Sequence, residues 1–364
     1  MKIIETYHNF NKNVLDIFEQ MKNTPQSPIH HAEGDVYRHT TMVVNEVEKI
    51  KEQFSEEAQR RLIYTGIFHD IAKPETTEMI WVKGEKDWIS PKHAKYGEPM
   101  FRDLMWEEFG FENREQIAKL IRYHGLPLWF EDKENPDMSI IKTSLGCNIK
   151  ELVAFAECDF RGRICGDLDE CLFKIELFKE RAIQLGCFDI PYQFTSDWAR
   201  LHYFKNGEYP GKEIWEPEGP WCVVMCGLPG SGKNHWINKN WYGSIIELDA
   251  IRKKHKIKWS DKNAQGFVAQ EAKEMLRVNM REKRDVLWNG TNMTAQQRAA
   301  IIDIARDYKA KIKIVYIDCS VPQALKQNKS RPEYEQVKDS VIKKYSRKME
   351  IPDKTECHEL VVVY

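Results

Sequence analysis

A glycine-rich segment with one lysine follows a short apolar run in the second half of the chain. It reads Gly227-Leu228-Pro229-Gly230-Ser231-Gly232-Lys233-Asn234 and precedes a stretch with helical periodicity. Glycines let backbone N–H groups converge on an anion, and the following helix presents the positive end of its dipole. Lys233 would reach the β- and γ-phosphates of a nucleotide. The segment therefore predicts a phosphate-binding loop for ATP or another NTP with Mg²⁺.

The loop departs from the usual pattern at one position. Ser or Thr normally follows the lysine and contacts Mg²⁺ through its hydroxyl, whereas this chain has Asn234. The amide oxygen of Asn234 could meet the metal directly or through a water molecule. The substitution therefore bears on metal affinity and leaves the predicted fold unchanged.

A carboxylate and an arginine follow the next apolar run, residues 244–248. Ligands of an open α/β sheet bind at the carboxyl ends of the strands, so Asp249 would face the nucleotide and take the proton of an attacking hydroxyl. Arg252 would face the same cleft from the start of a helix. An aspartate at this point would also suit a helix N-cap, and the spacing alone leaves both roles open.

The loop, Asp249-x-x-Arg252 and the later segment Asn289-Gly290-Thr291-Asn292-Met293-Thr294 together resemble the phage-type 5′-hydroxyl polynucleotide kinases, a branch of the P-loop kinases. The resemblance implies that Asp249 activates a 5′-hydroxyl and that Arg252 contacts a phosphate of the acceptor strand. The third motif of this family more often begins with Asp, and Asn289 stands in its place. A role of residue 289 close to the metal is thereby weakened.

The same resemblance extends to a lid and to a basic run. Asn328-Lys329-Ser330-Arg331 is similar to the lid motif of the family, which implies that Arg331 contacts the transferring phosphoryl group, with Arg298 and Arg347 as second choices. Arg331 could also be a solvated helix residue. Residues 252–258 contain five basic side chains beside Trp259, a composition that suits a strand of phosphates next to a stacking ring, although basic runs are usually solvated faces.

Histidines and aspartates recur in the first half of the chain, within or at the ends of helical stretches. They are His39, the pair His69-Asp70, His93, His124 and Asp159. Histidine and carboxylate ligands on several helices are typical of a metal site inside a helical bundle. The ordered set, together with Gly66-Ile67-Phe68-His69-Asp70-Ile71-Ala72-Lys73, resembles the HD phosphohydrolase superfamily over about residues 28–190.

This second resemblance implies two metals. His39, His69, Asp70 and Asp159 would hold one divalent ion, while His93 and His124 would hold another with Asp70 as the bridge. Divalent transition metals such as Mn²⁺, Co²⁺, Ni²⁺, Fe²⁺ or Zn²⁺ suit these ligands, and a metal pair generates a hydroxide nucleophile and clamps phosphate oxygens.

Four further side chains lie near these motifs in the sequence. Lys73, one helical turn after Asp70, would neutralise the phosphate or pair with a carboxylate. Arg163 is a further candidate for contact with phosphate. His30 and His31 lie outside the motif and are expected to be structural.

The elements that must position these residues change in type along the chain. Up to about Gly186 the apolar spacing is helical, with Met79–Val82 as a possible hairpin arm, whereas short apolar runs alternate with helices after Trp221. The sequence predicts an all-α HD-superfamily bundle at residues 1–190, then a linker that packs on a domain at 191–220. An α/β P-loop kinase domain with a parallel sheet would follow at 221–364.

Composition agrees with two such domains. The chain has 364 residues and a net charge of −1, but residues 221–364 carry 27 basic and 17 acidic side chains, against 28 and 39 before them. The apolar content excludes disorder as the main state, and no run approaches the roughly 18 apolar residues that a membrane span needs. Nine scattered cysteines and the lack of a signal-peptide pattern predict reduced thiols and a cytoplasmic location.

Taken together, the chain resembles the bacterial HD-domain polynucleotide kinase–phosphatase family. The resemblance implies an end-healing enzyme for RNA or DNA, which phosphorylates a 5′-hydroxyl and removes a 3′-phosphate, a 2′-phosphate or a 2′,3′-cyclic phosphate. An HD nucleotidase fused to a small-molecule kinase is the alternative. A non-catalytic nucleic-acid-binding module, suggested by Asn234 and Asn289, is a third possibility that intact Lys233, Asp249 and Arg331 disfavour.

Overall fold

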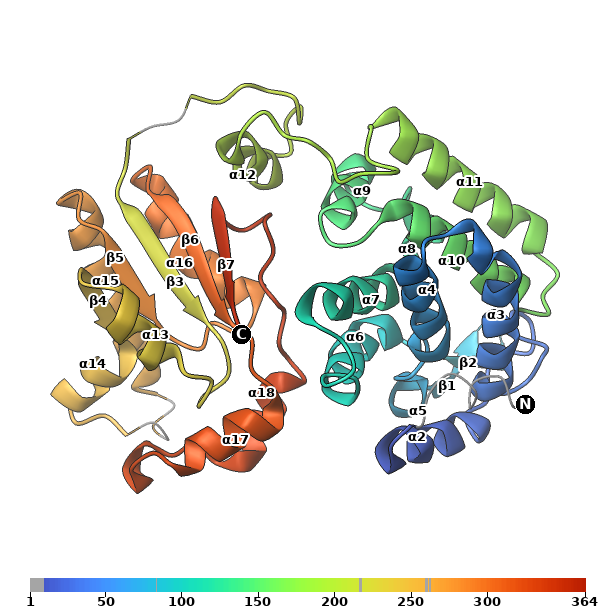
Figure 1. Cartoon of the computed structure of the whole chain (residues 1–364), viewed down its shortest axis with the longest axis horizontal. Coiled ribbons are helices and arrows are strands. Elements are labelled where there is room, and N and C mark those ends of the chain that lie inside the picture. The colour runs from blue at the N-terminus through green and yellow to red at the C-terminus, as the bar shows by residue number, and fades with distance from the viewer. Residues whose placement is uncertain (1–9, 83, 216–217, 259–260, 262) are drawn as a thin grey trace. The chain divides into compact units, whose positions relative to one another are not determined.

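The computed structural model describes residues 10–82, 84–215, 218–258, 261 and 263–364, which divide between Gln193 and Phe194 into two compact units. Figure 1 shows a helical first unit and a second unit built around a sheet. The predicted stacking residue Trp259 lies outside the described residues. The two-part fold class predicted from the sequence is confirmed, with one addition, a small hairpin in the first unit.

The first unit is a bundle of helices with a two-stranded antiparallel sheet. The helices are α2 (Lys12–Lys22), α3 (Val36–Ile50), α4 (Glu56–Phe68), α5 (Lys73–Thr76), α6 (His93–Leu104), α7 (Phe111–Tyr123), α8 (Leu126–Trp129), α9 (Pro136–Ser144), α10 (Ile149–Arg161) and α11 (Leu168–Gln184), with a 3₁₀ turn at Lys51–Gln53. The hairpin joins β1 (Glu78–Val82) to β2 (Glu85–Ile89). It confirms the hairpin arm expected from the sequence.

Four helices of this bundle enclose the centre of the unit. Helix α4 packs against α3, α7 and α10, and most of its last two turns are buried, including Leu62, Ile67 and Phe68. Side-chain caps fix where α3, α4 and α10 begin, because Asp35, Ser55 and Asn148 accept hydrogen bonds from backbone N–H groups of the first turns. The starts of these helices therefore have defined positions, and His39 lies in the first turn of α3, close to its cap.

The second unit contains a five-stranded parallel sheet in the order β4-β5-β3-β6-β7. Its strands are β3 (Trp221–Cys226), β4 (Ser244–Glu247), β5 (Val286–Asn289), β6 (Lys311–Ile317) and β7 (Glu359–Val363). The helices are α12 (Asp197–Asn206), α13 (Lys233–Asn240), α14 (Leu248–Lys254), α15 (Gln265–Arg281), α16 (Ala295–Asp307), α17 (Val321–Lys329) and α18 (Asp339–Ser346), with a 3₁₀ turn at Glu333–Glu335. Strand β7 was not predicted.

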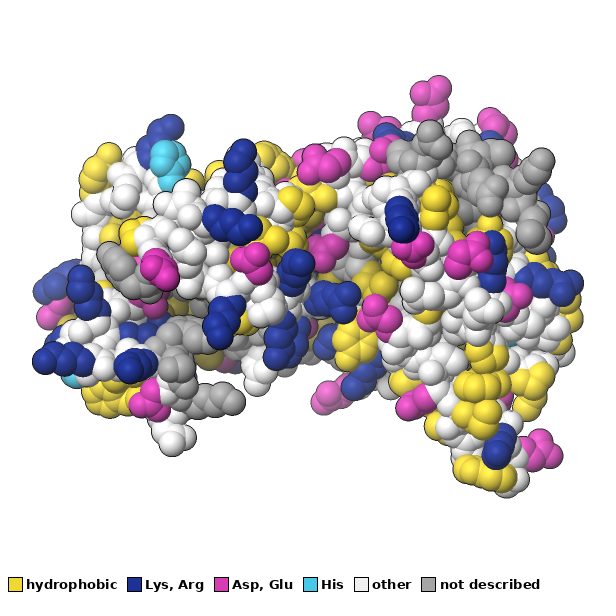
Figure 2. Space-filling view, turned by 90° about the horizontal axis from the view of Figure 1, so that it is seen from below, with side chains coloured by type: hydrophobic (Ala, Val, Ile, Leu, Met, Phe, Trp, Pro, Cys, Tyr) yellow, Lys and Arg dark blue, Asp and Glu magenta, His cyan; other side chains and the backbone are white. Residues whose placement is uncertain are grey.

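Helix α12 lies in the segment that the sequence marks as a linker, and it packs on the second unit. The Arg200 guanidinium donates hydrogen bonds to the backbone carbonyls of Lys354 and Cys357, and the Trp198 ring lies 4.1 Å from the ring of His358 between centroids. On the face shown in Figure 2, Lys and Arg side chains are more common on the second unit than Asp and Glu side chains. This agrees with its excess of positive charge in the sequence.

Two candidate active sites

The predicted histidine and aspartate ligands of the first unit converge at the centre of the bundle. His39 Nε2 lies 3.0 Å from Asp159 Oδ1, 3.3 Å from His69 Nε2 and 3.7 Å from Asp70 Oδ2. These groups come from α3, the end of α4 and α10, and all four residues are almost wholly buried. The structure thus brings together the four residues that the sequence assigned to one metal.

The second predicted set lies on the other side of Asp70. His93, at the start of α6, places Nε2 3.4 Å from Asp70 Oδ1 and 3.2 Å from Nε2 of His124, the residue that follows α7. Asp70 therefore points one oxygen toward each histidine group. Two overlapping clusters of possible metal ligands, His39–His69–Asp70 and Asp70–His93–His124, result from this geometry.

Backbone contacts orient all four rings. Nδ1 of His69, His93 and His124 lies 2.9, 2.8 and 2.8 Å from the carbonyl oxygens of Gly66, Ser90 and Ile121. Nδ1 of His39 lies 3.2 Å from the carbonyl oxygen of Gly162. A proton on each Nδ1 leaves the Nε2 lone pair free for a metal, which is the usual arrangement of histidine ligands.

The charge state of the cluster also suits cations. Burial lowers the pKa of His124 to about 3 and also lowers that of His93, so both rings are neutral ligands near pH 7. Burial opposes ionisation of Asp70, but its electrostatic interactions with His69 and Lys73 hold its pKa well below the usual range. Both oxygens of Asp70 are buried without a hydrogen bond of regular geometry from the described residues, and Oδ2 forms an ion pair with Lys73. A buried carboxylate with this few hydrogen bonds fits a metal bridge.

Two basic side chains flank the cluster. Lys73 is buried, and its Nζ lies 2.8 Å from Asp70 Oδ2 and donates to Gln26 Oε1 at 2.7 Å. Arg163 donates to Asp159 Oδ2 at 2.6 Å. Of the two roles open to Lys73 in the sequence, the structure shows the pairing with a carboxylate.

Sequence reasoning missed Glu33. Its carboxylate is buried, lies 2.7 Å from His31 Nδ1 and 3.1 Å from His39 Nδ1, and accepts a hydrogen bond from the Ile164 backbone N–H at 2.9 Å. His31 packs behind the predicted ligand His39, and His31, Glu33 and His39 form a further group that could hold a metal ion, so the structural role expected for His31 stays a prediction. No spacing motif marks Glu33, because it meets His39 across a turn that precedes α3.

The loop of the second unit connects β3 to α13. Gly230 and Gly232 have φ of +82° and +99°, a region that other residues rarely adopt, and a Cβ on Gly230 would lie 2.5 Å from the Ala324 carbonyl oxygen. The Ser231 hydroxyl is buried without a hydrogen-bond partner. Lys233 Nζ donates to the carbonyl oxygens of Gly227 and Leu228 at 2.9 and 2.8 Å. The lysine therefore closes over the loop, within reach of an anion held there.

Asp249 lies in the first turn of α14, just after β4, and is not its N-cap, a position that Glu247 occupies. The Asp249 side chain is 87% exposed, and its Oδ1 accepts a hydrogen bond from Arg252 Nη1 at 2.6 Å. Arg252 also donates to Gln265 Oε1 at 2.9 Å. Of the two roles left open by the sequence, the position of Asp249 inside the helix excludes the cap, and the role as a base stays a prediction.

Of the three arginines considered for the lid, Arg347 stays a prediction, and the other two have different environments. Arg331 follows α17 and is partly exposed, with one ion pair to Glu335 at 3.4 Å, and its charge contributes to the low pKa of Lys233. Arg298 is fully buried, donates to both carboxylate oxygens of Glu356 and contacts the Asn292 and Glu350 carbonyl oxygens. Arg298 is therefore a structural residue, and its choice as a lid residue was wrong.

The basic run is partly neutralised. Lys254 Nζ and His255 Nε2 lie 3.0 and 2.6 Å from the Glu271 carboxylate, while Lys253 and Lys256 are exposed.

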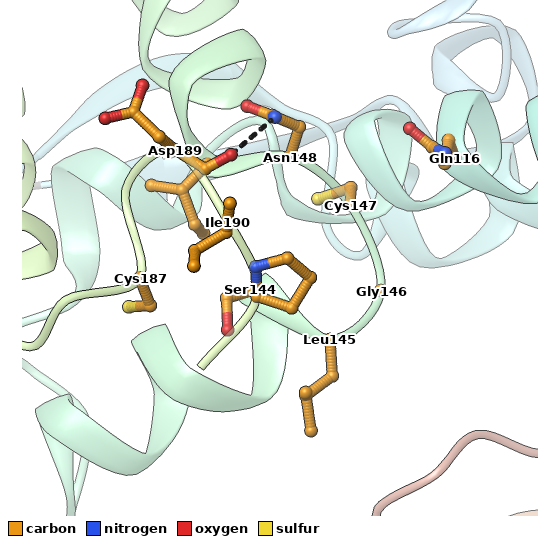
Figure 3. A pocket seen from close by; sticks show the side chains of 11 residues that line it. Gln116, Ser144, Leu145, Gly146, Cys147, Asn148, Cys187, Asp189 and Ile190 are labelled. Atoms are coloured by element: carbon orange, nitrogen blue, oxygen red, sulfur yellow. Dashed lines mark hydrogen bonds between the residues drawn. The ribbon is translucent and has the colours of Figure 1, made fainter. Parts of the chain in front are cut away.

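A hollow of about 200 Å³ lies in the first unit between the loop after α9 and residues 187–191 (Figure 3). Asn148 donates to the Asp189 carbonyl oxygen at its rim. The hollow contains none of the predicted site residues.

Comparisons with known proteins agree with this two-part geometry. The HD domain model matches residues 36–142, and the AAA domain model matches residues 222–352. The chain therefore joins an HD domain to a P-loop domain. These are the two domain types of the polynucleotide kinase–phosphatases that it resembles. The HD match ends before Asp159, which joins the cluster from α10.

Solved structures include chains that are similar to this one. No curated protein matches the chain. A solved chain titled "Structure of the Pnkp1/Rnl/Hen1 RNA repair complex" is similar at 18% identity and a TM-score of 0.33, over 40% of this chain and 46% of that one. This chain thus spans less than half of that neighbour. Among the described residues, no helix has the length and apolarity needed to cross a bilayer.

Proposed function

We propose that the chain is a bifunctional nucleic-acid end-healing enzyme of RNA or DNA. Its P-loop domain, residues 221–364, is an NTP-dependent 5′-hydroxyl polynucleotide kinase. Its HD domain, residues 1–190, is a metal-dependent phosphohydrolase of 3′-phosphate, 2′-phosphate or 2′,3′-cyclic phosphate ends. The observation that carries the proposal is the presence in one chain of a glycine-rich loop with an Asp–Arg pair after the next strand and of a cluster of six histidine and aspartate side chains, five of them buried.

In the kinase, the chain positions both substrates and neutralises charge. Backbone N–H groups of residues 227–232 and the Lys233 ammonium hold the β- and γ-phosphates, with Asn234 beside them. Asp249 takes the proton of the 5′-hydroxyl as that oxygen attacks the γ-phosphorus in line. Arg252 orients the acceptor strand, and Arg331 balances the charge of the transferring group. Bound Mg²⁺ supplies further neutralisation of the phosphate oxygens.

In the phosphohydrolase, His39, His69, Asp70 and Asp159 would hold one divalent metal, and His93 and His124 with Asp70 would hold a second. When bound, these metals would supply Lewis-acid chemistry to the water nucleophile and the phosphate. The buried backbone contacts at Nδ1 fix the four imidazoles before metal arrives. Lys73 and Arg163 hold Asp70 and Asp159 ionised and lie where an incoming phosphate needs positive charge.

The two proposed activities act on the two ends that one cleavage produces, because cleavage that leaves a 5′-hydroxyl also leaves phosphate on the other end. A pair of small-molecule activities, an HD nucleotidase and a metabolite kinase, is the second candidate. The Asp249 side chain is exposed, and so are the neighbouring Lys253 and Lys256. An exposed carboxylate beside exposed cations favours a large acceptor with several phosphates over a small molecule.

The decisive experiment supplies γ-labelled ATP with either a 5′-hydroxyl oligonucleotide or a nucleoside, and follows phosphate release from a 3′-phosphate oligonucleotide in parallel. We expect label on the oligonucleotide and not on the nucleoside, together with phosphate release. Label on the nucleoside alone would favour the small-molecule kinase. No turnover of any substrate, with Mg²⁺ and transition metals supplied, would favour the non-catalytic module.

A further inference from the structure

The two departures of this chain from the usual P-loop pattern lie in direct contact. Asn289, at the end of β5, donates one hydrogen bond from Nδ2 to Asn234 Oδ1 at 3.0 Å and another to Glu247 Oε1 at 2.7 Å. Asn234 follows the loop lysine, and Glu247 is the last residue of β4, which pairs with β5 in a register that sets residue 247 opposite residue 289. Three side chains from three elements therefore form one hydrogen-bonded group.

This group lacks the anionic residue that the pattern would place at position 289. An amide at 289 adds no charge beside the nucleotide, and an amide at 234 offers a neutral oxygen where a hydroxyl is usual. Mg²⁺ is generally held through one or two carboxylates together with waters and phosphate oxygens. A Mg²⁺ ion at this loop thus needs a carboxylate from elsewhere in the chain.

Glu247 is placed to provide it. Its carboxylate is partly buried at the carboxyl end of a strand, the edge at which open α/β sheets bind ligands. Within the described part of the chain, no lysine, arginine or histidine forms an ion pair with it, whereas Asp249 is paired with Arg252. One oxygen of Glu247 accepts a hydrogen bond from the Asn289 amide, so the carboxylate is held in place without a cationic side chain paired to it among the described residues.

We infer that Glu247 supplies the carboxylate of the kinase Mg²⁺ site, with Asn234 as its neutral neighbour and Asn289 as the residue that holds both in place. The negative charge has moved from β5 to the adjacent strand β4, and the hydrogen-bonded group keeps it beside the residue that follows Lys233. This inference rests on the proposed nucleotide binding of the second unit, but not on the identity of the phosphoryl acceptor.

Calorimetric titration with a non-hydrolysable ATP analogue tests the inference without any acceptor. Binding is measured without Mg²⁺ and with Mg²⁺ in roughly 5–10-fold excess over the nucleotide, so that the metal site is saturated in the second condition. The parent protein should bind the analogue more tightly with Mg²⁺. Glu247→Gln should lose about tenfold or more of the Mg²⁺-dependent affinity and keep the affinity measured without Mg²⁺.

Two further variants separate metal binding from a structural role. Adding Asn289→Asp to Glu247→Gln returns a carboxylate to the position of the usual motif and should restore the Mg²⁺ dependence. Glu282→Gln removes an exposed carboxylate after α15 in the same unit and should leave it unchanged.

The possible failures are distinguishable. Full Mg²⁺ dependence in Glu247→Gln would overturn the inference while leaving the proposed kinase intact. Equal weakening with and without Mg²⁺, with no rescue by Asn289→Asp, would make Glu247 a structural residue and also overturn it. A parent protein that binds no nucleotide at all would instead contradict the proposed function.

Discussion

The Glu33 carboxylate lies 3.1 Å from Nδ1 of His39, on the side of the imidazole opposite to Nε2, which faces Asp159. Burial alone would lower the pKa of His39, but hydrogen bonds to Asp159 and Glu33 raise it. A carboxylate behind a histidine fixes the ring and makes its other nitrogen a stronger ligand. Glu33 is thus a positioning residue for the proposed metal site.

We predict that Glu33→Gln weakens divalent metal binding by about 10–100-fold, because the amide keeps the shape of the side chain but loses its charge. Competition with a chromophoric chelator would measure the affinity, and thermal unfolding would check that the variant folds. Glu78→Gln, an exposed change on β1, is the matched control. Unchanged metal affinity in a folded Glu33→Gln would show that Glu33 only supports the turn.

Loss of the proposed base should affect one activity only. Asp249→Ala should slow kinase turnover by about 10²–10⁴ and leave phosphate release unchanged. The exposed carboxylate has one ion pair, so little stability should be lost. Steady-state rates on the two oligonucleotides measure both effects, and equal kinase rates in variant and parent would eliminate Asp249 as the base.

Loss of the proposed bridging ligand should have the opposite effect. Asp70→Ala should abolish phosphate release and reduce the metal content measured by elemental analysis, because Asp70 faces both histidine groups. Its 5′-kinase rate should match that of the parent. Retained phosphate release in metal-replete buffer would rule out the two-metal site.

Arg298 and Arg331 should affect different properties of the second unit, its stability and its kinase rate. Arg298→Met leaves the partly buried Glu356 carboxylate without its buried partner and should lower the free energy of unfolding by about 3 kcal/mol. Arg331→Ala removes a partly exposed pair and should cost little stability, but slow the kinase by about 10²–10³. Urea unfolding and kinase rates on both variants test this contrast. A stable Arg298→Met protein would contradict it.

Lys233 should link nucleotide binding to protonation. Burial lowers the pKa of Lys233 to about 8 in the free protein. Bound phosphates favour the charged ammonium, so binding takes up a proton between about pH 8 and the usual lysine pKa of roughly 10.4, and affinity falls as the pH rises through this range.

Titration calorimetry at pH 9 in two buffers of different ionisation enthalpy would detect this proton uptake. Lys233→Arg keeps its charge at this pH and should show none. Equal binding enthalpies for the parent protein in the two buffers would disprove the linkage.

The sequence by itself determined which residues are chemically competent and which elements carry them. Apolar spacing marked the chain up to about Gly186 as helical, and the order Gly227–Lys233 between a strand and a helix marked the loop, because such signals depend on neighbours within a few residues. Strand β7 escaped prediction since five residues after an irregular segment gain their conformation only from pairing with β6.

Only the tertiary structure decided which of these residues meet. Glu33 lies six residues before His39 and Glu247 lies 42 before Asn289, yet each pair is in contact because a turn and a strand register bring them together. Burial likewise distinguishes Arg298 from Arg331, because the sequence alone does not show which of two arginines is buried. Contacts, burial and charge pairing depend on the packing of distant segments, and the spacing of residues along a chain does not contain them.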